Sequence, residues 1–234
     1  MKVTEIVIEN LYGKDYIIPI KDNKLVLVGV NGTCKSTILH IIHDLLNLHR
    51  FSYYKFDKAY IAIDDINYEI VNNVRDGIGV GIKGKLTYPA NYPTIETMFS
   101  SGNHYDIQLI GKRNGKVITV INKYLSDSDK IADIVDNIIL VKQNDIIIPF
   151  DDLSNGEKKI INILTMFYSI TEPIGLIIDD SEMNLSVRWQ RTFLQDILDS
   201  GNCNLLITAT HSPFIYKYLE DYRHDITKLT KNNT

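Results

Sequence analysis

Cysteine, proline and long apolar runs are scarce in this chain of 234 residues. Its two cysteines, Cys34 and Cys203, lie far apart in the sequence and indicate no disulfide framework. No apolar stretch approaches the roughly 20 residues that a helix needs to cross a bilayer, and the N-terminal segment alternates like a strand, without the apolar core of a secretory signal. Lys and Arg (25) do not outnumber Asp and Glu (29), which disfavours a general nucleic-acid-binding surface and leaves a local DNA contact open. We therefore expect a soluble, cytoplasmic protein with no membrane partner.

What the chain does have is apolar material for a core, since 44 % of its residues are hydrophobic. At both ends of the chain, short apolar runs alternate with segments of helical periodicity. This pattern predicts an α/β fold with a mostly parallel sheet flanked by helices. The middle, residues 51–150, is expected to be an antiparallel β insertion with a small helical piece, so that residues 1–234 form a single domain.

Period-two alternation and buried apolar runs predict the strands: Val3–Glu9, Tyr16–Ile20, Lys24–Val28, Tyr60–Ile63, Asn67–Val71, Tyr105–Ile110, Lys116–Ile121, Ile174–Ile178 and Asn204–Thr208. Apolar stripes at helical spacing predict the helices: Ile38–Leu48, Ser126–Leu140, Glu157–Tyr168, Val187–Leu198 and Phe214–Asp221.

Residues 29–37 read GVNGTCKST and join a buried strand to a helix. Backbone N–H groups of such a loop and the N-terminus of the following helix can cradle phosphate. The segment fits the phosphate-loop pattern G-x-x-x-x-G-K-[ST] except that Cys34 stands where glycine is usual. We expect Lys35, facing solvent, to reach the β- and γ-phosphates and Ser36 to bind Mg²⁺; the plain alternative is an ordinary turn between a strand and a helix. The candidate nucleotide-binding residues are Gly29, Asn31, Gly32, Thr33, Cys34, Lys35, Ser36 and Thr37.

Three further segments follow in the second half of the chain. Leu153-Ser154-Asn155-Gly156-Glu157 precedes an amphipathic helix, the strand at 174–178 ends in Asp179 and Asp180, and the strand at 204–208 runs on to His211. Each has an ordinary structural explanation: a helix cap, turn aspartates, a histidine at a strand end. Because ligands of open α/β sheets bind at the carboxyl ends of the strands, the combination favours one nucleotide site.

This order of motifs resembles the ABC-type ATPase head of the soluble branch that includes SMC, RecF and OLD-like proteins. The resemblance extends to residues 178–185, IDDSEMNL, followed by Trp189-Gln190, and to residues 209–214, ATHSPF. It implies a P-loop NTPase of ABC-ATPase type, made of a phosphate-loop part (1–50), the insertion (51–150) and a signature, acidic-strand and switch-histidine part (151–234). It covers residues 1–48 and 150–220 best.

The resemblance also implies a set of functional roles. ATP and Mg²⁺ are the expected cofactors, with Asp179 and Ser36 at the metal and Asp180 and His211 as catalytic residues. Ser154, Gly156 and Glu157 are expected to complete the site of a second copy, giving a homodimer around an ATP sandwich with Asn184–Leu185 at its seam. An effector or nuclease partner, in DNA repair or anti-phage defence, is expected by analogy with other small ATPases of this shape.

Three departures from the family pattern bear on the activity. Cys34 replaces a glycine, Asp180 replaces the usual glutamate, and Ser181 replaces the usual proline. The first two favour slow hydrolysis, or an alternative in which the chain is a non-hydrolysing, nucleotide-gated interaction module. A transporter ATPase subunit is a third hypothesis, which the acid-Ser-Glu-x-Asn-Leu stretch and Trp189 disfavour.

Overall fold

The computed structural model describes residues 2–47, 54–64, 66–72, 80–83, 95–98, 115–136, 138–228 and 230–232. The fold divides into two compact units that interleave along the chain. The first comprises Met1–Phe99, Ile174–Ser181 and Asn204–Thr234, and the second comprises Ser100–Pro173 and Glu182–Cys203. Of the described helices, none combines the length and the apolar character needed to cross a membrane.

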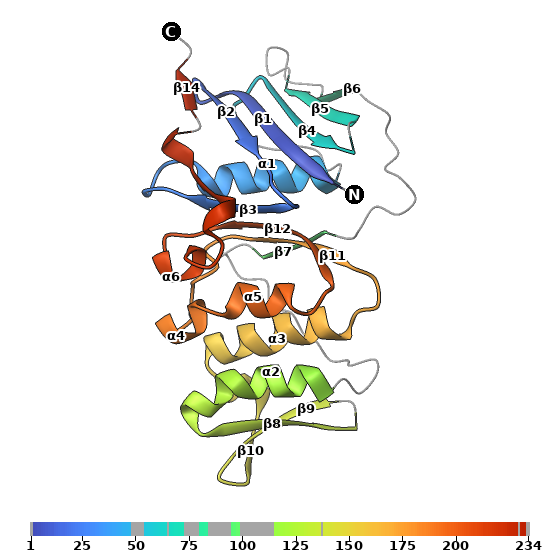
Figure 1. Cartoon of the computed structure of the whole chain (residues 1–234), viewed down its shortest axis with the longest axis vertical. Coiled ribbons are helices and arrows are strands. Elements are labelled where there is room, and N and C mark those ends of the chain that lie inside the picture. Colours follow the sequence, from blue (N-terminus) through green and yellow to red (C-terminus); the bar gives the residue numbers. More distant parts are fainter. Residues whose placement is uncertain are drawn as a thin grey trace. The chain divides into compact units, whose positions relative to one another are not determined.

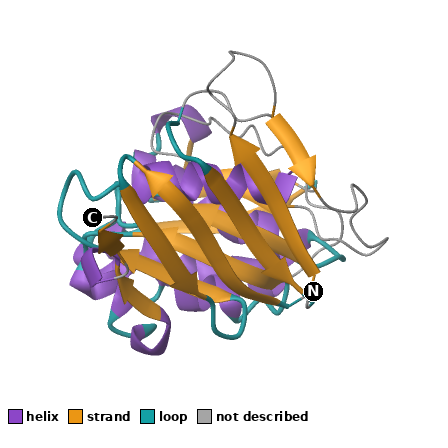
Figure 2. Ribbon diagram, turned by 90° about the horizontal axis from the view of Figure 1, so that it is seen from above, coloured by secondary structure: helices purple, strands orange, loops and turns teal. Residues whose placement is uncertain are grey.

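The first unit contains a six-stranded sheet, shown face-on in Figure 2. Its strand order is β14-β2-β1-β4-β5-β6, and its described pairings are antiparallel. The strands are β1 (Val3–Leu11), β2 (Lys14–Pro19), β4 (Lys58–Ile63), β5 (Ile66–Asn72), β6 (Val80–Lys83) and β14 (Thr230–Asn232). The C-terminal strand β14 therefore pairs with the N-terminal hairpin.

A second sheet in the same unit has the order β13-β3-β12-β11-β7. Its strands are β3 (Lys24–Val28), β7 (Ile95–Met98), β11 (Ile174–Ile178), β12 (Cys203–Ala209) and β13 (Arg223–Asp225). Strand β3 pairs in parallel with both β12 and β13, and β11 pairs in parallel with β7. Every residue of β11 is buried, as expected for a parallel strand covered on both faces.

Helix α1 (Lys35–Asn47) lies between these two sheets (Figure 1). The apolar stripe that predicted this helix is its buried face, and it joins side chains of both sheets in one core cluster. At the helix's amino end, that core lies directly beside the loop that follows β3. The core thereby fixes where the loop begins and ends.

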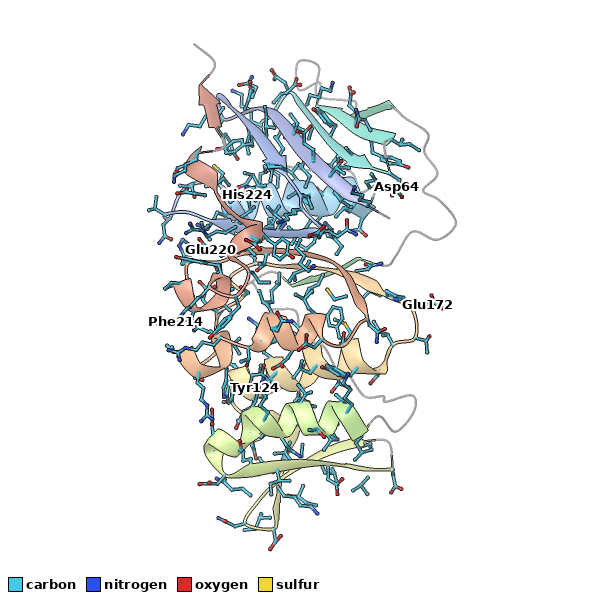
Figure 3. The ribbon with its side chains drawn as sticks, viewed as in Figure 1. Asp64, Tyr124, Glu172, Phe214, Glu220 and His224 are labelled. Carbon is cyan, nitrogen blue, oxygen red and sulfur yellow. The ribbon has the colours of Figure 1, made fainter. Side chains whose placement is uncertain are left out.

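The second unit contains four α-helices among its described residues and a three-stranded antiparallel sheet. The helices are α2 (Gly115–Leu125), α3 (Asn155–Ser169), α4 (Val187–Gln190) and α5 (Phe193–Leu198), and the strands are β8 (Lys130–Val135), β9 (Ile138–Gln143) and β10 (Ile146–Ile148). The side chain of Tyr124, labelled in Figure 3, rises from α2 and hydrogen-bonds Asp196 of α5. Burial raises the pKa of this tyrosine, and the bond to Asp196 adds to the effect.

The expected α/β architecture is confirmed, and most strands and helices at the two ends lie within a few residues of their predicted bounds. The helix predicted over Ser126–Leu140 is wrong: a short 3₁₀ turn leads into the hairpin β8–β9. The left-handed backbone at Asp129 and Asp136 ends any helix there. The strand predicted over Lys116–Ile121 is also wrong, because Val117, Ile121 and Leu125 share the buried face of α2. The strand predicted over 105–110 lies outside the described residues.

Other boundaries differ near the C-terminus. The helix predicted over Val187–Leu198 is two short helices, α4 and α5. The helix predicted over Phe214–Asp221 is α6 (Pro213–Tyr216) followed by a 3₁₀ turn at Glu220–Tyr222. Strands β13 and β14 were not predicted, because three-residue strands carry too little periodicity to be recognised.

Candidate nucleotide-binding site

The candidate site lies where three neighbouring strands of the five-stranded sheet end. Loop 29–34 follows β3, residues 210–212 follow β12, and Asp179 follows β11. Strand β12 lies between the other two, and β3 and β12 run in parallel. Three segments that are distant in sequence therefore meet at one edge, where ligands of such sheets bind.

Two glycines give the phosphate loop its path for different reasons. A Cβ atom at Gly29 would lie 2.9 Å from both Ile226 Cγ2 and Thr33 Oγ1, so a larger residue there would have to displace these side chains. Gly32 has a φ of +80°, a left-handed conformation that suits glycine. The Thr33 hydroxyl donates to the Val30 carbonyl at 2.8 Å and closes the turn. The loop is therefore held by packing against Ile226 and by its own Thr33–Val30 hydrogen bond.

Lys35, the first residue of α1, is buried, with 6 % of its surface exposed, so the expectation of a solvent-facing side chain is wrong. Its Nζ donates to the carbonyl oxygens of Gly29 at 2.9 Å and Val30 at 3.2 Å. A buried ammonium needs such partners, because desolvation is costly. The side chain therefore lies back along the loop, with its cation beside the loop's backbone.

Cys34 occupies the position just before this lysine with a φ of +65°. Left-handed backbone is unfavourable for a residue with a Cβ, by about 1–2 kcal/mol. Its side chain packs against the core of the first unit and shares a hydrogen bond with the Tyr16 hydroxyl of β2. Burial, together with this thiol, raises the pKa of Tyr16 to about 12. No sequence pattern associates Tyr16 with the loop.

The acidic pair after β11 has a defined backbone. Asp179 is buried, and its Oδ1 accepts a hydrogen bond from the Asp180 N–H at 3.1 Å. Asp180 has a left-handed φ of +45°. The fully buried Ser181 donates its N–H to the Ala209 carbonyl at 3.3 Å, which ties the end of β11 to β12.

The end of β12 is tied to the phosphate-loop strand in the same way. The Thr210 N–H donates to the Leu27 carbonyl at 3.1 Å, and the Thr210 hydroxyl accepts the Ser212 N–H at 3.0 Å. His211, between them, is exposed. These backbone bonds set the spacing of the three strand ends independently of any side chain that faces a ligand.

A Mg²⁺ ion would be held here by oxygen atoms. The Ser36 hydroxyl is on the exposed second residue of α1, and the Asp179 carboxylate is at the end of β11. Hydroxyl and carboxylate oxygens, completed by water and phosphate, are the donors that Mg²⁺ prefers, so the residues fit the ion. In the described part of the chain, no group of three or more His, Cys, Asp and Glu side chains forms a metal cluster of its own.

His40 is a neighbour of Asp179 that sequence reasoning missed. It lies on α1, and its ring centroid is 5.9 Å from that of Tyr54. Burial lowers the pKa of His40, while the negative charges of Asp179 and Asp44 act in the opposite direction. Its spacing of four residues from Ser36, which puts both on one face of the helix, is the signal that would have suggested it.

Ser154 and Glu157 belong to the second unit and form a capping box at the start of α3. The Ser154 Oγ accepts the Glu157 N–H at 3.3 Å, and Glu157 Oε2 accepts the Ser154 N–H at 2.9 Å. Glu157 Oε1 accepts bonds from Lys130 Nζ at 2.8 Å and Ser128 Oγ at 3.0 Å. Burial alone would raise the pKa of Glu157, but these hydrogen bonds outweigh it and hold the pKa below its ordinary value.

Gly156, between them, is required by packing within the second unit. A Cβ there would lie 2.2 Å from the Asn184 carbonyl oxygen and 3.3 Å from Trp189 Cζ3. Asn184 has a left-handed φ of +63°, and the Trp189 Nε1–H donates to Asp127 at 2.8 Å. The segment at 184–185 therefore lies against the amino end of α3.

The fold is similar to those of solved ATPase heads. The SMC head domain from Thermotoga maritima matches with a TM-score of 0.57 at 12 % identity, over 93 % of this chain and 92 % of that one. An Smc head bound to the C-terminal domain of ScpA, from Pyrococcus furiosus, matches with a TM-score of 0.60 at 11 % identity, over 92 % and 91 %. A putative ABC transporter ATP-binding protein from Pyrococcus furiosus matches with a TM-score of 0.50 at 13 % identity, over 97 % and 100 %.

At these identities the likeness concerns the fold, which is that of a P-loop NTPase of ABC-ATPase type, as the sequence predicted. A search of curated protein sequences found no match. A family model described as "AAA domain, putative AbiEii toxin, Type IV TA system" matches residues 96–216, just over half of the chain. The chain therefore belongs to this AAA-domain family and has the architecture of a small SMC/ABC-like ATPase head.

Proposed function

We propose that this protein binds Mg-ATP, dimerises head to head around it, and hydrolyses it slowly to control a partner protein. The observation that carries the proposal is the convergence of loop 29–34, Asp179 and His211 at adjacent strand ends of one sheet. A glycine loop that opens a helix is suited to phosphate, and a buried carboxylate two strands away is suited to a cation.

Each residue would have a separate task. The backbone of Gly29, Asn31, Gly32, Thr33, Cys34 and Thr37 would surround the phosphates, and Lys35 would exchange its two loop carbonyls for β- and γ-phosphate oxygens. Ser36 and Asp179 would hold Mg²⁺, which supplies charge neutralisation at the phosphates when bound. Asp180 would orient the attacking water and His211 would contact the γ-phosphate.

The dimer proposal concerns the exposed Ser154 at the amino end of α3. In a second copy, the Ser154 hydroxyl and the N–H groups that begin α3 would complete the γ-phosphate site, since a helix N-terminus attracts anions. Gly156 would keep that helix end close to 184–185, and Glu157 would fix the serine through the capping box.

The partner would be an effector or nuclease, and the process anti-phage defence or DNA repair. The name of the matched family, which mentions a toxin and a toxin–antitoxin system, supports a defence setting. The Smc head bound to a domain of ScpA supports the general idea that heads of this fold engage other proteins. Direct binding to DNA remains a separate hypothesis, because the chain has a net charge of −4.

A second candidate function is a nucleotide-gated interaction module that does not turn ATP over. The left-handed backbone of Cys34 and Asp180 favours it, since both residues depart from the usual family pattern at strained positions. Steady-state phosphate release separates the two functions. Release that falls in Asp180→Asn supports the ATPase, whereas binding without release supports the module.

Lys35→Ala tests the nucleotide site. ATP affinity measured by calorimetry should fall by at least tenfold, because the cation nearest the phosphates is lost. Lys14→Ala, an exposed lysine in the same unit, is the matched control and should bind ATP normally. Unchanged affinity in Lys35→Ala, with a normal circular dichroism spectrum, would contradict the assignment of the loop.

Asn155→Arg tests the dimer while leaving the Ser154 cap intact. The exposed first residue of α3 gains a long side chain that would enter the partner's phosphate site. Sedimentation with a slowly hydrolysed ATP analogue should show a dimer for the wild type and a monomer for Asn155→Arg. Ser126→Arg, an exposed position of the same unit, is the control and should still dimerise. A wild type that stays monomeric with the analogue would count against the head dimer.

A further inference from the structure

The sheet β8–β9–β10 of the second unit has two unlike faces. Helix α2 lies along one face of this sheet (Figure 1). Ala132 and Val141 are directly paired across β8 and β9 and are buried, and the Ala132 N–H donates to Asn122 of α2. Because side chains alternate along a strand, their neighbours point to the opposite side. We call that side the outer face; its positions are Ile131, Asp133 and Val135 of β8, Ile138, Leu140 and Lys142 of β9, and Ile147 of β10.

The outer face is exposed and yet apolar. Ile131, Ile138 and Ile147 are 65 %, 59 % and 54 % exposed, and Val135 is 41 % exposed. The cross-strand register places Val135 opposite Ile138, and Lys142 opposite both Ile131 and Ile147. The uncovered face of an antiparallel sheet is normally polar. Exposed aliphatic side chains gathered on one face of a sheet, with a polar rim, are typical of an interaction site.

Acidic side chains surround this face. Asp133 lies on it, Asp136 lies in the β8–β9 turn, and Asp145 lies in the β9–β10 turn. All of these aspartates are exposed. Of the two lysines on these strands, Lys142 lies on the outer face, whereas Lys130 points to the opposite face and pairs with Glu157. The net charge of the side chains on and around the outer face is therefore negative.

The charge distribution distinguishes between two kinds of occupant. A second copy docked through the same face would bring the acidic surround against itself, and juxtaposed like charges disfavour an interface. A stable interface buries about 800 Å² on each partner. Because Asp133 lies on the outer face itself, its charge would be part of any such contact.

We propose that the outer face of β8–β9–β10 binds a different protein, through a segment that presents aliphatic side chains flanked by Lys or Arg. The aliphatic side chains would cover the isoleucines, and the cations would pair with the surrounding aspartates. This surface lies wholly within the second unit.

Photo-crosslinking in the cells that make the protein tests this. Benzoylphenylalanine at position 147 places the probe on the outer face, and the same residue at position 66, an isoleucine of β5 that is 47 % exposed, is the matched control. We expect an adduct with a different polypeptide from position 147, at least tenfold above the control. Mass spectrometry should find the linked segment rich in aliphatic residues with Lys or Arg beside them.

Variants test whether the adduct depends on the isoleucines and aspartates of the outer face. Ile138→Lys and Ile131→Lys change exposed side chains, so they should leave the unfolding midpoint nearly unchanged while lowering the adduct yield at least tenfold. Asp133→Lys combined with Asp136→Lys should also lower the yield, and Ile66→Lys should not. The proposal is overturned by an adduct between two copies, by a yield no higher than at position 66, by a linked segment without basic residues, or by full yield in Ile138→Lys.

Discussion

Replacing Gly156 by alanine should destabilise the second unit, although the glycine lies in the motif assigned to ATP contact. The new Cβ would lie 2.2 Å from the Asn184 carbonyl oxygen, a backbone atom that cannot rotate away. Ordinary contacts between carbon and a carbonyl oxygen are about 3.3–3.6 Å. The substitution therefore demands a shift of about 1 Å between the amino end of α3 and the 184–185 segment.

The size of the effect follows from two opposing terms. Overpacking of this kind costs about 1–3 kcal/mol, sometimes more. Alanine gains up to about 1 kcal/mol over glycine as a helix residue. The overlap is with backbone, so we place the cost at the upper end and expect a net loss of about 2 kcal/mol. For a chain of this size, this corresponds to a fall in Tm of about 4–8 °C.

Gly115→Ala is the matched control, because Gly115 begins α2 in the same unit and has open space where its Cβ would be. Its stability should stay the same or rise slightly. Urea and thermal unfolding of both variants, followed by circular dichroism without nucleotide, provide the comparison. If the two variants unfold alike, the close approach at Gly156 is not a packing constraint. The glycine would then matter only for contact with nucleotide.

Three further predictions concern stability and binding. The hydrogen bonds of Glu157 hold its pKa below the ordinary value, so the ionised carboxylate stabilises the folded protein. This stabilisation is complete above the unfolded pKa of about 4.3 and is lost as the pH falls through the native pKa. The free energy of unfolding in urea between pH 6 and 3 should therefore depend less on pH in Glu157→Gln than in the wild type, and parallel curves would contradict this. Tyr124→Phe should cost about 1 kcal/mol, because Asp196 loses a hydrogen bond, whereas Tyr218→Phe, at an exposed position, should cost nothing measurable. If the loop binds ATP as proposed, Cys34→Gly should relieve about 1 kcal/mol of backbone strain in the free and the bound loop alike, so ATP affinity in calorimetry should change by less than about fivefold; a larger change would contradict a left-handed residue 34 in both states.

The hairpin β8–β9 shows where the sequence misled. Ile131, Ile134, Val135, Ile138 and Ile139 repeat at helical spacing, so their stripe predicted a helix. In the structure the same residues lie on both faces of two paired strands, and the choice between helix and hairpin depends on pairing between Val135 and Ile138 and on the left-handed turn at 136. Periodicity in a short apolar segment does not separate these cases.

Local signals correctly predicted the strand and the helix on either side of loop 29–34. The strand Lys24–Val28 is an unbroken apolar run, and the α1 stripe spans three turns, so both elements are specified by neighbours in the sequence. Apolar runs in the sequence also predicted β11, which precedes Asp179, and β12, which precedes His211. Neighbouring residues sufficed here because strand–loop–helix units are built from short-range backbone bonding.

The sequence by itself determined the α/β class, the glycine loop that opens a helix, and the Ser154 cap with its glutamate three residues later. Only the tertiary structure placed Ile226 against Gly29, Tyr16 against Cys34, and the Asn184 carbonyl against Gly156. The physical reason is distance along the chain: caps and turns close within a few residues, whereas these contacts join segments that meet only after the sheets and helices have packed.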